Sequence, residues 1–174
     1  EYLSRKNAPQ KMSEIIDKVH LIDHNGQPFN RNTLKNKPSL LFFGFTNCPE
    51  ICPTTLADLS EITKEVTSSV NAINIIFVTL DPIRDNKKHL KDYVQYFGSN
   101  IIGVTGDKVE IKKFAENWGV FYESVNTSDN NYTLNLIEFS KLLEKLEIFE
   151  LNHKNTIYRN LIKFIQPVNN LNFQ

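Results

Sequence analysis

The chain has 174 residues, a length that suits one domain with a single core and leaves little room for a second. Hydrophobic residues make up 40% of the chain and charged residues 23%, which is typical of a folded, soluble domain. The 20 basic and 20 acidic side chains cancel, which argues against nucleic acid or an anionic membrane as a partner, and no apolar run approaches the roughly 20 residues that cross a bilayer.

The first 18 residues are polar and weakly patterned, and we expect them to form a lead-in arm. A short strand is predicted at residues 19–22, before an Asp-His-Asn-Gly turn at residues 23–26. Asn and Gly tolerate positive φ, so this turn predicts an N-terminal hairpin. The sequence begins at Glu1 and not at methionine, which suggests a processed or trimmed chain and leaves room for a removed signal or anchor.

The stretch at residues 40–55 holds both cysteines, and the rest of the prediction is arranged around it. The apolar run at residues 40–45 predicts a strand at 39–45 that is buried on both faces. A polar loop then carries Cys48, and Cys52 opens a segment with helical spacing of apolar residues that reaches about residue 68. Two thiols four positions apart at a helix N-terminus lie about one turn apart on one side, where they can meet each other or one metal ion.

The following segments alternate between strand and helix patterns. Strands are predicted at 73–80, 101–104 and 120–125, and helices around the apolar positions of 90–97 and 111–118. This alternation indicates an α/β fold with right-handed crossovers. Functional residues in such folds lie at the carboxyl ends of strands, which is where Cys48 and Asp81 stand.

The C-terminal part is less regular. A polar loop at 126–131 precedes a helical pattern at 136–149, then His153, then the apolar residues of a strand or hairpin at 155–165. We therefore divide the chain into an arm at 1–18, one domain at 19–165 with an insertion or divergent segment at 134–150, and a tail at 166–174.

The cysteine pair has three open roles, namely a structural disulfide, a redox couple or a metal site. A disulfide across so short a loop removes little chain entropy, so stabilisation is a poor reason for it. The helix N-terminus favours thiolates, which are the form that attacks and ligates. The spacing of three residues differs from the redox motif Cys-x-x-Cys and suits two sulfurs on one metal.

A third ligand is expected, because two side chains undercoordinate a metal such as zinc. Two thiolates and one imidazole form a suitable copper site. Three of the four histidines have ordinary positions: His20 in the first predicted strand, His24 in the turn and His89 on the polar side of a helix. His153 is the remaining candidate.

Two acidic residues follow the strand predicted at 73–80. Asp85 is expected to cap the next helix. Capping does not explain Asp81, whose carboxylate at the strand end is placed to orient a ligand or tune a thiol.

A family resemblance rests on two segments. Gly-Phe-Thr-Asn-Cys-Pro-Glu-Ile-Cys-Pro-Thr-Thr-Leu at 44–56 and Val-Thr-Leu-Asp-Pro-Ile-Arg-Asp at 78–85 resemble the SCO/SenC family of copper-binding assembly proteins, and the likeness runs from about residue 19 to 123. The resemblance implies a thioredoxin-like fold with a central mixed sheet flanked by helices. It also implies a membrane-tethered soluble domain, on the periplasmic face of a bacterial inner membrane or in the mitochondrial intermembrane space, although the tether is absent from this sequence.

The same resemblance implies a metallochaperone that binds one copper ion and delivers it to cytochrome c oxidase subunit II during assembly. Carried over residue by residue, the ligands are Cys48, Cys52 and a distant histidine, with Asp81 as a supporting acid. Such a protein is a carrier and not an enzyme. The alternative is a thiol-disulfide oxidoreductase that reduces the cysteines of a cuproprotein through a reversible Cys48–Cys52 disulfide. A peroxidase fits less well, because both thiols lie in one loop with no separate resolving cysteine.

The histidine is where the sequence departs from the family. One register places the histidine motif at 151–158, displaced by the insertion, and makes His153 the third ligand. A second register places it at 132–136, with Leu136 in place of the histidine. We adopt the first register, because Ile157 and Tyr158 follow His153 at the expected interval.

Overall fold

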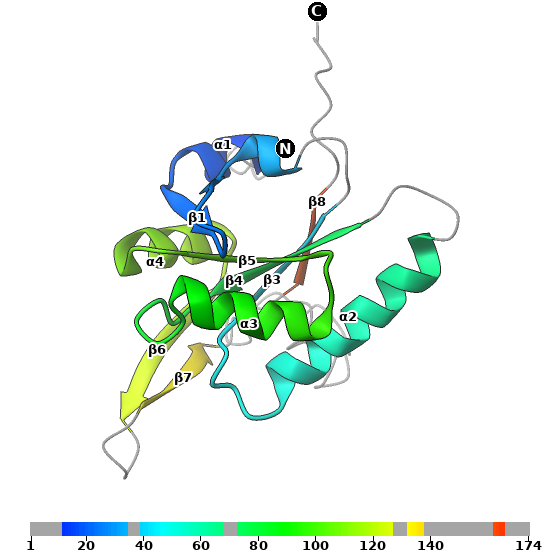
Figure 1. The fold of residues 1–174 in the computed structure, drawn as a ribbon. Coiled ribbons are helices and arrows are strands. Elements are labelled where there is room, and N and C mark those ends of the chain that lie inside the picture. The colour runs from blue at the N-terminus through cyan, green and yellow to red at the C-terminus, as the bar shows by residue number, and fades with distance from the viewer. Residues whose placement is uncertain (1–11, 35–38, 68–72, 127–131, 138–161, 166–174) are drawn as a thin grey trace, which may run out of the picture.

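The computed structural model describes residues 12–34, 39–67, 73–126, 132–137 and 162–165 of the chain (Figure 1). The helices are α1 (Met12–Asp17), the 3-10 helix η1 (Arg31–Leu34), α2 (Ile51–Thr67), α3 (Lys87–Phe97) and α4 (Lys108–Asn117). The strands are β1 (Leu21–Asp23), β2 (Pro28–Phe29), β3 (Ser39–Gly44), β4 (Asn74–Thr79), β5 (Ile101–Gly106), β6 (Phe121–Asn126), β7 (Tyr132–Ile137) and β8 (Ile162–Ile165).

The central sheet has the strand order β2-β1-β5-β4-β3-β8. Its middle strands β3, β4 and β5 are parallel, whereas β1 pairs with β5, and β8 with β3, in antiparallel fashion. The predicted mixed sheet is therefore confirmed, and the antiparallel pairing of β1 with β2 confirms the N-terminal hairpin. In the register of β3 and β4, Gly44 lies opposite Thr79, so both strands end at the same edge of the sheet.

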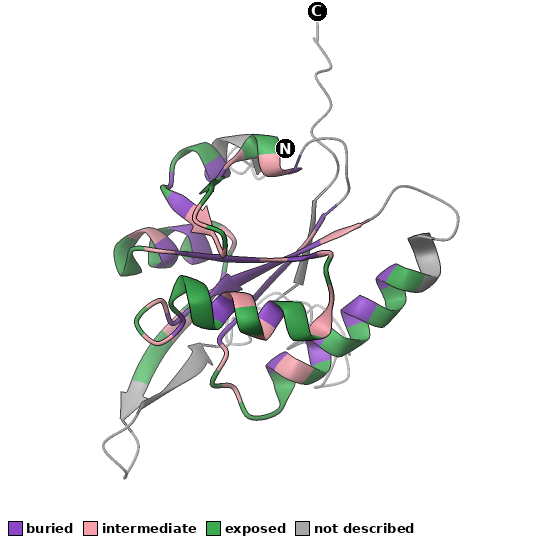
Figure 2. Cartoon of the chain, viewed as in Figure 1, coloured by how far each residue is buried: buried purple, intermediate pink, exposed green. Residues whose placement is uncertain are grey.

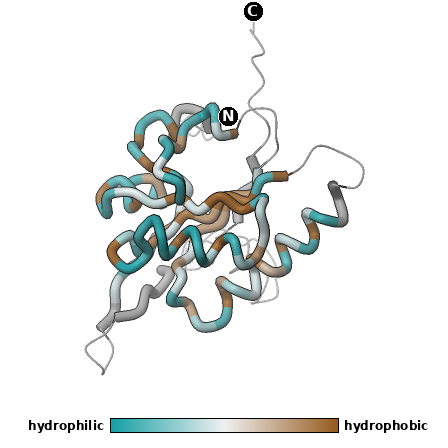
Figure 3. The backbone as a smooth tube through the Cα atoms, in the orientation of Figure 1, coloured by the Kyte–Doolittle hydropathy of each residue, from teal (hydrophilic) through white to brown (hydrophobic). Residues whose placement is uncertain are grey.

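Strand β3 is buried on both faces, as its unbroken apolar sequence predicts (Figures 2 and 3). Its successive side chains point to opposite faces. The ring of Phe42 lies 5.6 Å from that of Phe77, which in turn lies 5.6 Å from Tyr93 of α3. Phe43 instead packs on Phe114 of α4, with ring centroids 5.9 Å apart. The sheet is thus the middle layer of three.

Helices α2 and α3 cover one face of this sheet (Figure 1). Strands β3, β4 and β5 are successive neighbours, and right-handed crossovers place both connecting helices on the same side. The Ser60 hydroxyl on α2 donates a 2.7 Å hydrogen bond to the carbonyl of Phe97 on α3. Helices α1 and α4 pack together on the other face, where Ile15 and Ile16 of α1 are buried in the core.

Two boundaries differ from the sequence prediction at the N-terminal end. The predicted arm at 1–18 contains α1, whose buried isoleucines show that the core extends past residue 19 toward the N-terminus. The first strand is Leu21–Asp23 and not 19–22, because it pairs with β5 only from Leu21 onward. Within the described residues, no helix is both long and apolar enough to cross a membrane.

The C-terminal part differs more. Strand β6 pairs with β7 in a separate two-stranded sheet. Residues 136–137, predicted as the start of a helix, therefore belong to a strand, and so do residues 134–137 of the predicted insertion. Strand β8 lies within the segment predicted as a strand or hairpin. His153, the remainder of the insertion and the tail at 166–174 lie outside the described residues.

Candidate functional site

The candidate site lies where β3 and β4 end at the same edge of the sheet. The cysteine loop, residues 45–50, joins β3 to α2, and the aspartate loop, residues 80–86, joins β4 to α3. The two loops begin side by side, since the amide of Leu80 donates a 2.7 Å hydrogen bond to the carbonyl of Gly44. The prediction that Cys48 and Asp81 follow neighbouring strand ends is therefore confirmed.

The two cysteines carry free thiols in unequal surroundings. Cys48 lies in the loop and is half-buried, whereas Cys52 lies in the first turn of α2 and is only 3% exposed. A Cβ atom at position 44 would lie 2.9 Å from the Cys52 sulfur and 2.8 Å from the ring of Phe77. Glycine at the end of β3 therefore leaves the space that the sulfur occupies.

The pKa values of these thiols shift in opposite directions. A hydrogen bond from Cys52 lowers the pKa of Cys48 to about 6, and the amides of Cys52, Glu50 and Ile51 add to this effect against an opposing contribution from burial. The pKa of the Cys52 thiol is raised, first by its hydrogen bond to Cys48 and then by burial. We expected the helix N-terminus to favour two thiolates, but the structure favours a Cys48 thiolate beside a Cys52 thiol.

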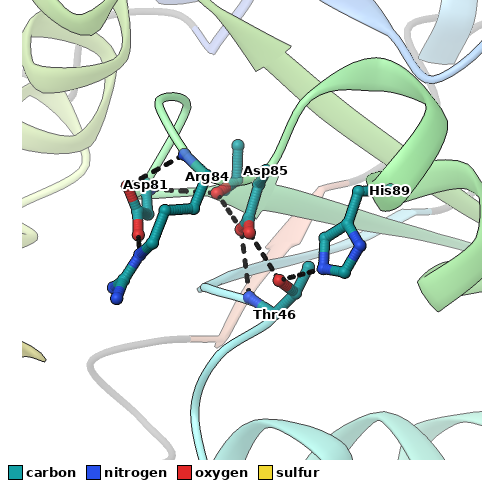
Figure 4. Close-up of polar contacts among 6 residues, drawn as sticks. Thr46, Asp81, Arg84, Asp85 and His89 are labelled. Atoms are coloured by element: carbon teal, nitrogen blue, oxygen red, sulfur yellow. Dashed lines mark hydrogen bonds and ion pairs between the residues drawn. The ribbon is translucent and has the colours of Figure 1, made fainter. Parts of the chain in front are cut away.

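Asp85 holds the two loops together (Figure 4). Its fully buried carboxylate accepts hydrogen bonds from the Thr46 amide at 3.0 Å, the Thr46 hydroxyl at 2.5 Å and the Thr79 hydroxyl at 2.6 Å. The expected role of Asp85 as a helix cap is wrong, because these inward contacts occupy its carboxylate. The cap is Asn86, whose side chain accepts a 3.0 Å hydrogen bond from the amide of His89.

His89 extends this network to the surface. Its Nε2 lies 2.9 Å from the Thr46 hydroxyl oxygen. Since that hydroxyl donates to Asp85, it accepts from His89, which assigns the ring proton to Nε2. The prediction that His89 lies on the polar side of a helix is confirmed, because its side chain is exposed on α3. The contact of His89 with Thr46 in the cysteine loop was not predicted.

Asp81 is buried with 3% exposure, and its carboxylate forms an ion pair with Arg84 inside the aspartate loop (Figure 4). The other described histidines lie in the N-terminal half. Nδ1 of His24 accepts a 2.9 Å hydrogen bond from the amide of Gly103 on β5, and the His20 ring lies 3.8 Å from the carboxylate of Glu110.

The thiol pair fits a soft metal ion. Two sulfurs close enough to share a hydrogen bond, one half-exposed and one buried, provide the donor type that copper(I) prefers. Among the described residues, no three His, Cys, Asp or Glu side chains gather as a metal site. His153 lies outside those residues, so its position as a third ligand stays a prediction.

Sequence reasoning missed Thr46 and Asp85 as residues of this site. A signal was present, since two aspartates four positions apart follow a buried strand. What the sequence does not show is which of them turns inward, because that depends on the hydroxyls of Thr46 and Thr79 that β3 and β4 bring to the same edge.

Comparisons with known proteins find relatives of this chain. A family model described as SCO1/SenC matches residues 7–149. The SCO2-like protein of Rickettsia felis is 41% identical over 126 residues, which cover 71% of this chain and 62% of that protein, so the chain spans about three fifths of this relative's length. The mitochondrial SCO2 protein of Saccharomyces cerevisiae is 37% identical over 106 residues, 60% of this chain and 35% of that protein.

Among solved structures, Bradyrhizobium japonicum ScoI with copper bound is similar, with a TM-score of 0.63 and 36% identity over 68% of this chain and 76% of that one. This likeness confirms the predicted thioredoxin-like α/β fold.

Proposed function

Because the chain belongs to the SCO1/SenC family, we propose that it is a copper chaperone that carries one copper ion on Cys48 and Cys52. The observation that carries this proposal is the thiol pair itself, placed at the carboxyl end of β3 with a low pKa for Cys48. The copper-bound ScoI structure, which is 36% identical, supports copper as the cargo.

The two cysteines have different tasks in this proposal. Cys48 is half-exposed and meets an incoming copper ion first, and Cys52 then closes the site from its buried position. Copper must displace the thiol protons, so binding weakens as pH falls. His153 supplies the third ligand, and Asp81 supports the site as a neighbouring acid.

Delivery is proposed to a copper protein of the respiratory chain, namely subunit II of cytochrome c oxidase. We propose a membrane-tethered domain that faces the mitochondrial intermembrane space or the bacterial periplasm, and the similarity to the mitochondrial SCO2 of Saccharomyces cerevisiae supports the first of these. Both compartments border the membrane in which that oxidase is assembled.

Titration of the reduced protein with copper(I) against a competing chelator tests the proposal. We expect one equivalent to bind, and Cys48→Ala and Cys52→Ala each to weaken binding by more than the roughly 100-fold that loss of an outer-shell partner costs. Thr54→Ala is a matched control on the exposed side of the same helix and leaves the affinity unchanged. Binding of no copper, or equal binding by Cys48→Ala, would contradict the proposal.

The same titration with His153→Ala addresses the third ligand. Loss of the imidazole is expected to weaken copper(II) binding and to change its absorption spectrum, because copper(II) prefers nitrogen donors more than copper(I) does. Identical spectra and affinities for the variant and the original chain would favour the register in which Leu136 replaces the histidine.

A thiol-disulfide oxidoreductase is the second candidate, and the opposite pKa shifts of the thiols favour it. A Cys48 thiolate can attack a disulfide of a partner protein, and Cys52 can then complete the exchange. Two electrons and two protons leave the thiols as a Cys48–Cys52 disulfide forms, and the partner's disulfide opens to two thiols. Measuring the reduction potential and the copper stoichiometry on one preparation separates the candidates, since a reductase needs no bound copper.

A further inference from the structure

The hydroxyl of Tyr93 is a buried polar group that has no role in the site described above. This residue lies on α3, and its hydroxyl is buried without a hydrogen-bond partner among the described residues. Burying a hydroxyl without a partner costs free energy, so each such group in a native structure calls for an explanation.

The ring of Tyr93 is held in place by aromatic contacts that lead to the thiols. It lies 5.6 Å from the ring of Phe77 and 5.2 Å from that of Phe97. Phe77 in turn borders the space at Gly44 that the sulfur of Cys52 fills. Phe77 therefore contacts the Tyr93 ring and also borders the space that the Cys52 sulfur occupies.

The electrostatic surroundings of the hydroxyl agree with this placement. Burial raises the pKa of Tyr93, and negative charge on Cys52, Cys48 and Asp85 raises it further. The hydroxyl therefore stays protonated and can donate. Asp85 is a poor acceptor for it, because its two carboxylate oxygens already accept from Thr46 and Thr79.

Other unpartnered groups do not share this position. The hydroxyl of Tyr122 and the indole nitrogen of Trp118 are also buried without partners among the described residues. The pKa of Tyr122 is raised to about 12 by burial and by Glu116 and Asp81, with no contribution from either thiol. Tyr93 is therefore the tyrosine that faces the charge of the cysteine pair.

We propose that the Tyr93 hydroxyl is a positioning group that donates a hydrogen bond to a cysteine sulfur once copper is bound. This inference rests on the proposed copper function. In the copper-free protein none of the described residues is a hydrogen-bond partner for this hydroxyl. Copper binding also removes the proton of Cys52, whose sulfur then becomes a negatively charged acceptor for this buried donor. The hydrogen bond stabilises the loaded form selectively.

Tyr93→Phe tests the inference, because it removes only the hydroxyl and keeps the ring between Phe77 and Phe97. We expect about tenfold weaker copper(I) binding in a chelator competition, since hydrogen bonds to charged acceptors are stronger than neutral ones. We also expect the cysteine-to-copper(II) charge-transfer band to move to longer wavelength. The urea midpoint of the copper-free variant should be equal to or higher than that of the original chain.

Tyr96→Phe is the matched control, since Tyr96 lies on the same helix and is 85% exposed. It should leave the copper affinity, the absorption band and the urea midpoint unchanged. Copper affinity of Tyr93→Phe within twofold of the original chain would overturn the inference while leaving the proposed function intact. A lower urea midpoint for copper-free Tyr93→Phe would also overturn it, because the hydroxyl would then have a structural partner. Failure of the original chain to bind copper would instead overturn the proposed function.

Discussion

The carboxylate of Asp85 shows how much of this site depends on one buried side chain. It accepts hydrogen bonds from Thr46 in the cysteine loop and from Thr79 at the end of β4, and it lies fully inside the protein. A buried charge is retained in a fold when hydrogen bonds compensate for the lost water. The cysteine loop is therefore fixed to the sheet through the carboxylate of one buried acid.

Replacing this acid is expected to be costly. Asp85→Ala leaves the amide and hydroxyl of Thr46 and the hydroxyl of Thr79 without their acceptor, and we expect a loss of about 2–4 kcal/mol in the free energy of unfolding. Asp58→Ala, on the exposed side of α2, is the control and should change it by less than about 0.5 kcal/mol. Urea unfolding of the copper-free variants measures both values, and a loss as small as that of the control would refute this account of Asp85.

Single residues were predictable where their chemistry is unusual for their position. Cys48 and Cys52 could be identified from the sequence, because a thiol pair at the start of a helix indicates metal binding or redox chemistry. Asp85 and Thr46 were not found, because aspartate after a strand and threonine in a loop have common local roles. Their contact joins positions 39 residues apart, and only the pairing of β3 with β4 creates it.

Helix α3 begins one residue later than expected, and this shift has a measurable consequence. Asn86 has the extended backbone of a cap residue and accepts from the amide of His89. We expect Asn86→Ala to lower the free energy of unfolding by about 1 kcal/mol, and Asn86→Asp to retain it, since Asp caps about as well as Asn. A thermal or urea unfolding series measures the difference. If both variants lose the same amount, the side-chain cap is not what stabilises the start of α3.

For helix α2, the periodicity of apolar residues predicts that a helix forms, but it does not predict correctly which residues are buried. Leu56, Leu59 and Ile62 repeat at helical spacing in the sequence, but Ile62 is 53% exposed. The buried side of the helix includes Ser60 and Thr63 instead. Their hydroxyls bond to the carbonyls of Phe97 and of Ser60, respectively, so the polar groups are satisfied inside. Hydrophobicity alone cannot reveal a buried face that is built from paired hydroxyls.

The whole sheet was predictable in its parallel centre and not at its edges. Buried apolar strands separated by helices specify β3, β4 and β5, because each step requires a right-handed crossover. The placement of β8 beside β3 and the separate β6–β7 sheet were not predicted. The periodicity of a sequence can indicate that a segment is a strand, but it does not indicate which distant strand pairs with it.

The contact between the N-terminal hairpin and the sheet should make the stability of the whole protein depend on pH. Nδ1 of His24 accepts from the amide of Gly103, and burial, followed by the charge of Lys91, lowers the pKa of His24 below its ordinary value of 6.5, against the charge of Asp23. The unfolded chain therefore binds a proton more readily than the folded one. The stability from this contact is complete above pH 6.5 and is lost as pH falls through the lower pKa of the folded state.

Urea unfolding of the copper-free protein at pH 7.5 and pH 5.5, with His24→Asn for comparison, measures this dependence. The variant should lose part of the pH effect, because an asparagine oxygen accepts without titrating. The difference is expected to be less than about 1 kcal/mol, since the ring is partly solvated.

The antiparallel pairing of β8 with β3 has a consequence for how the chain avoids aggregation while it folds. During synthesis, β3 and its cysteine loop emerge early, and β8 follows much later in the sequence. Until then the backbone N–H and C=O groups along one edge of the apolar strand β3 lack a partner strand, and such an edge recruits strands from other chains. A nascent or truncated chain that lacks residues 162–165 would expose the strand leading to its thiols to aggregation, whatever the quality of the site itself.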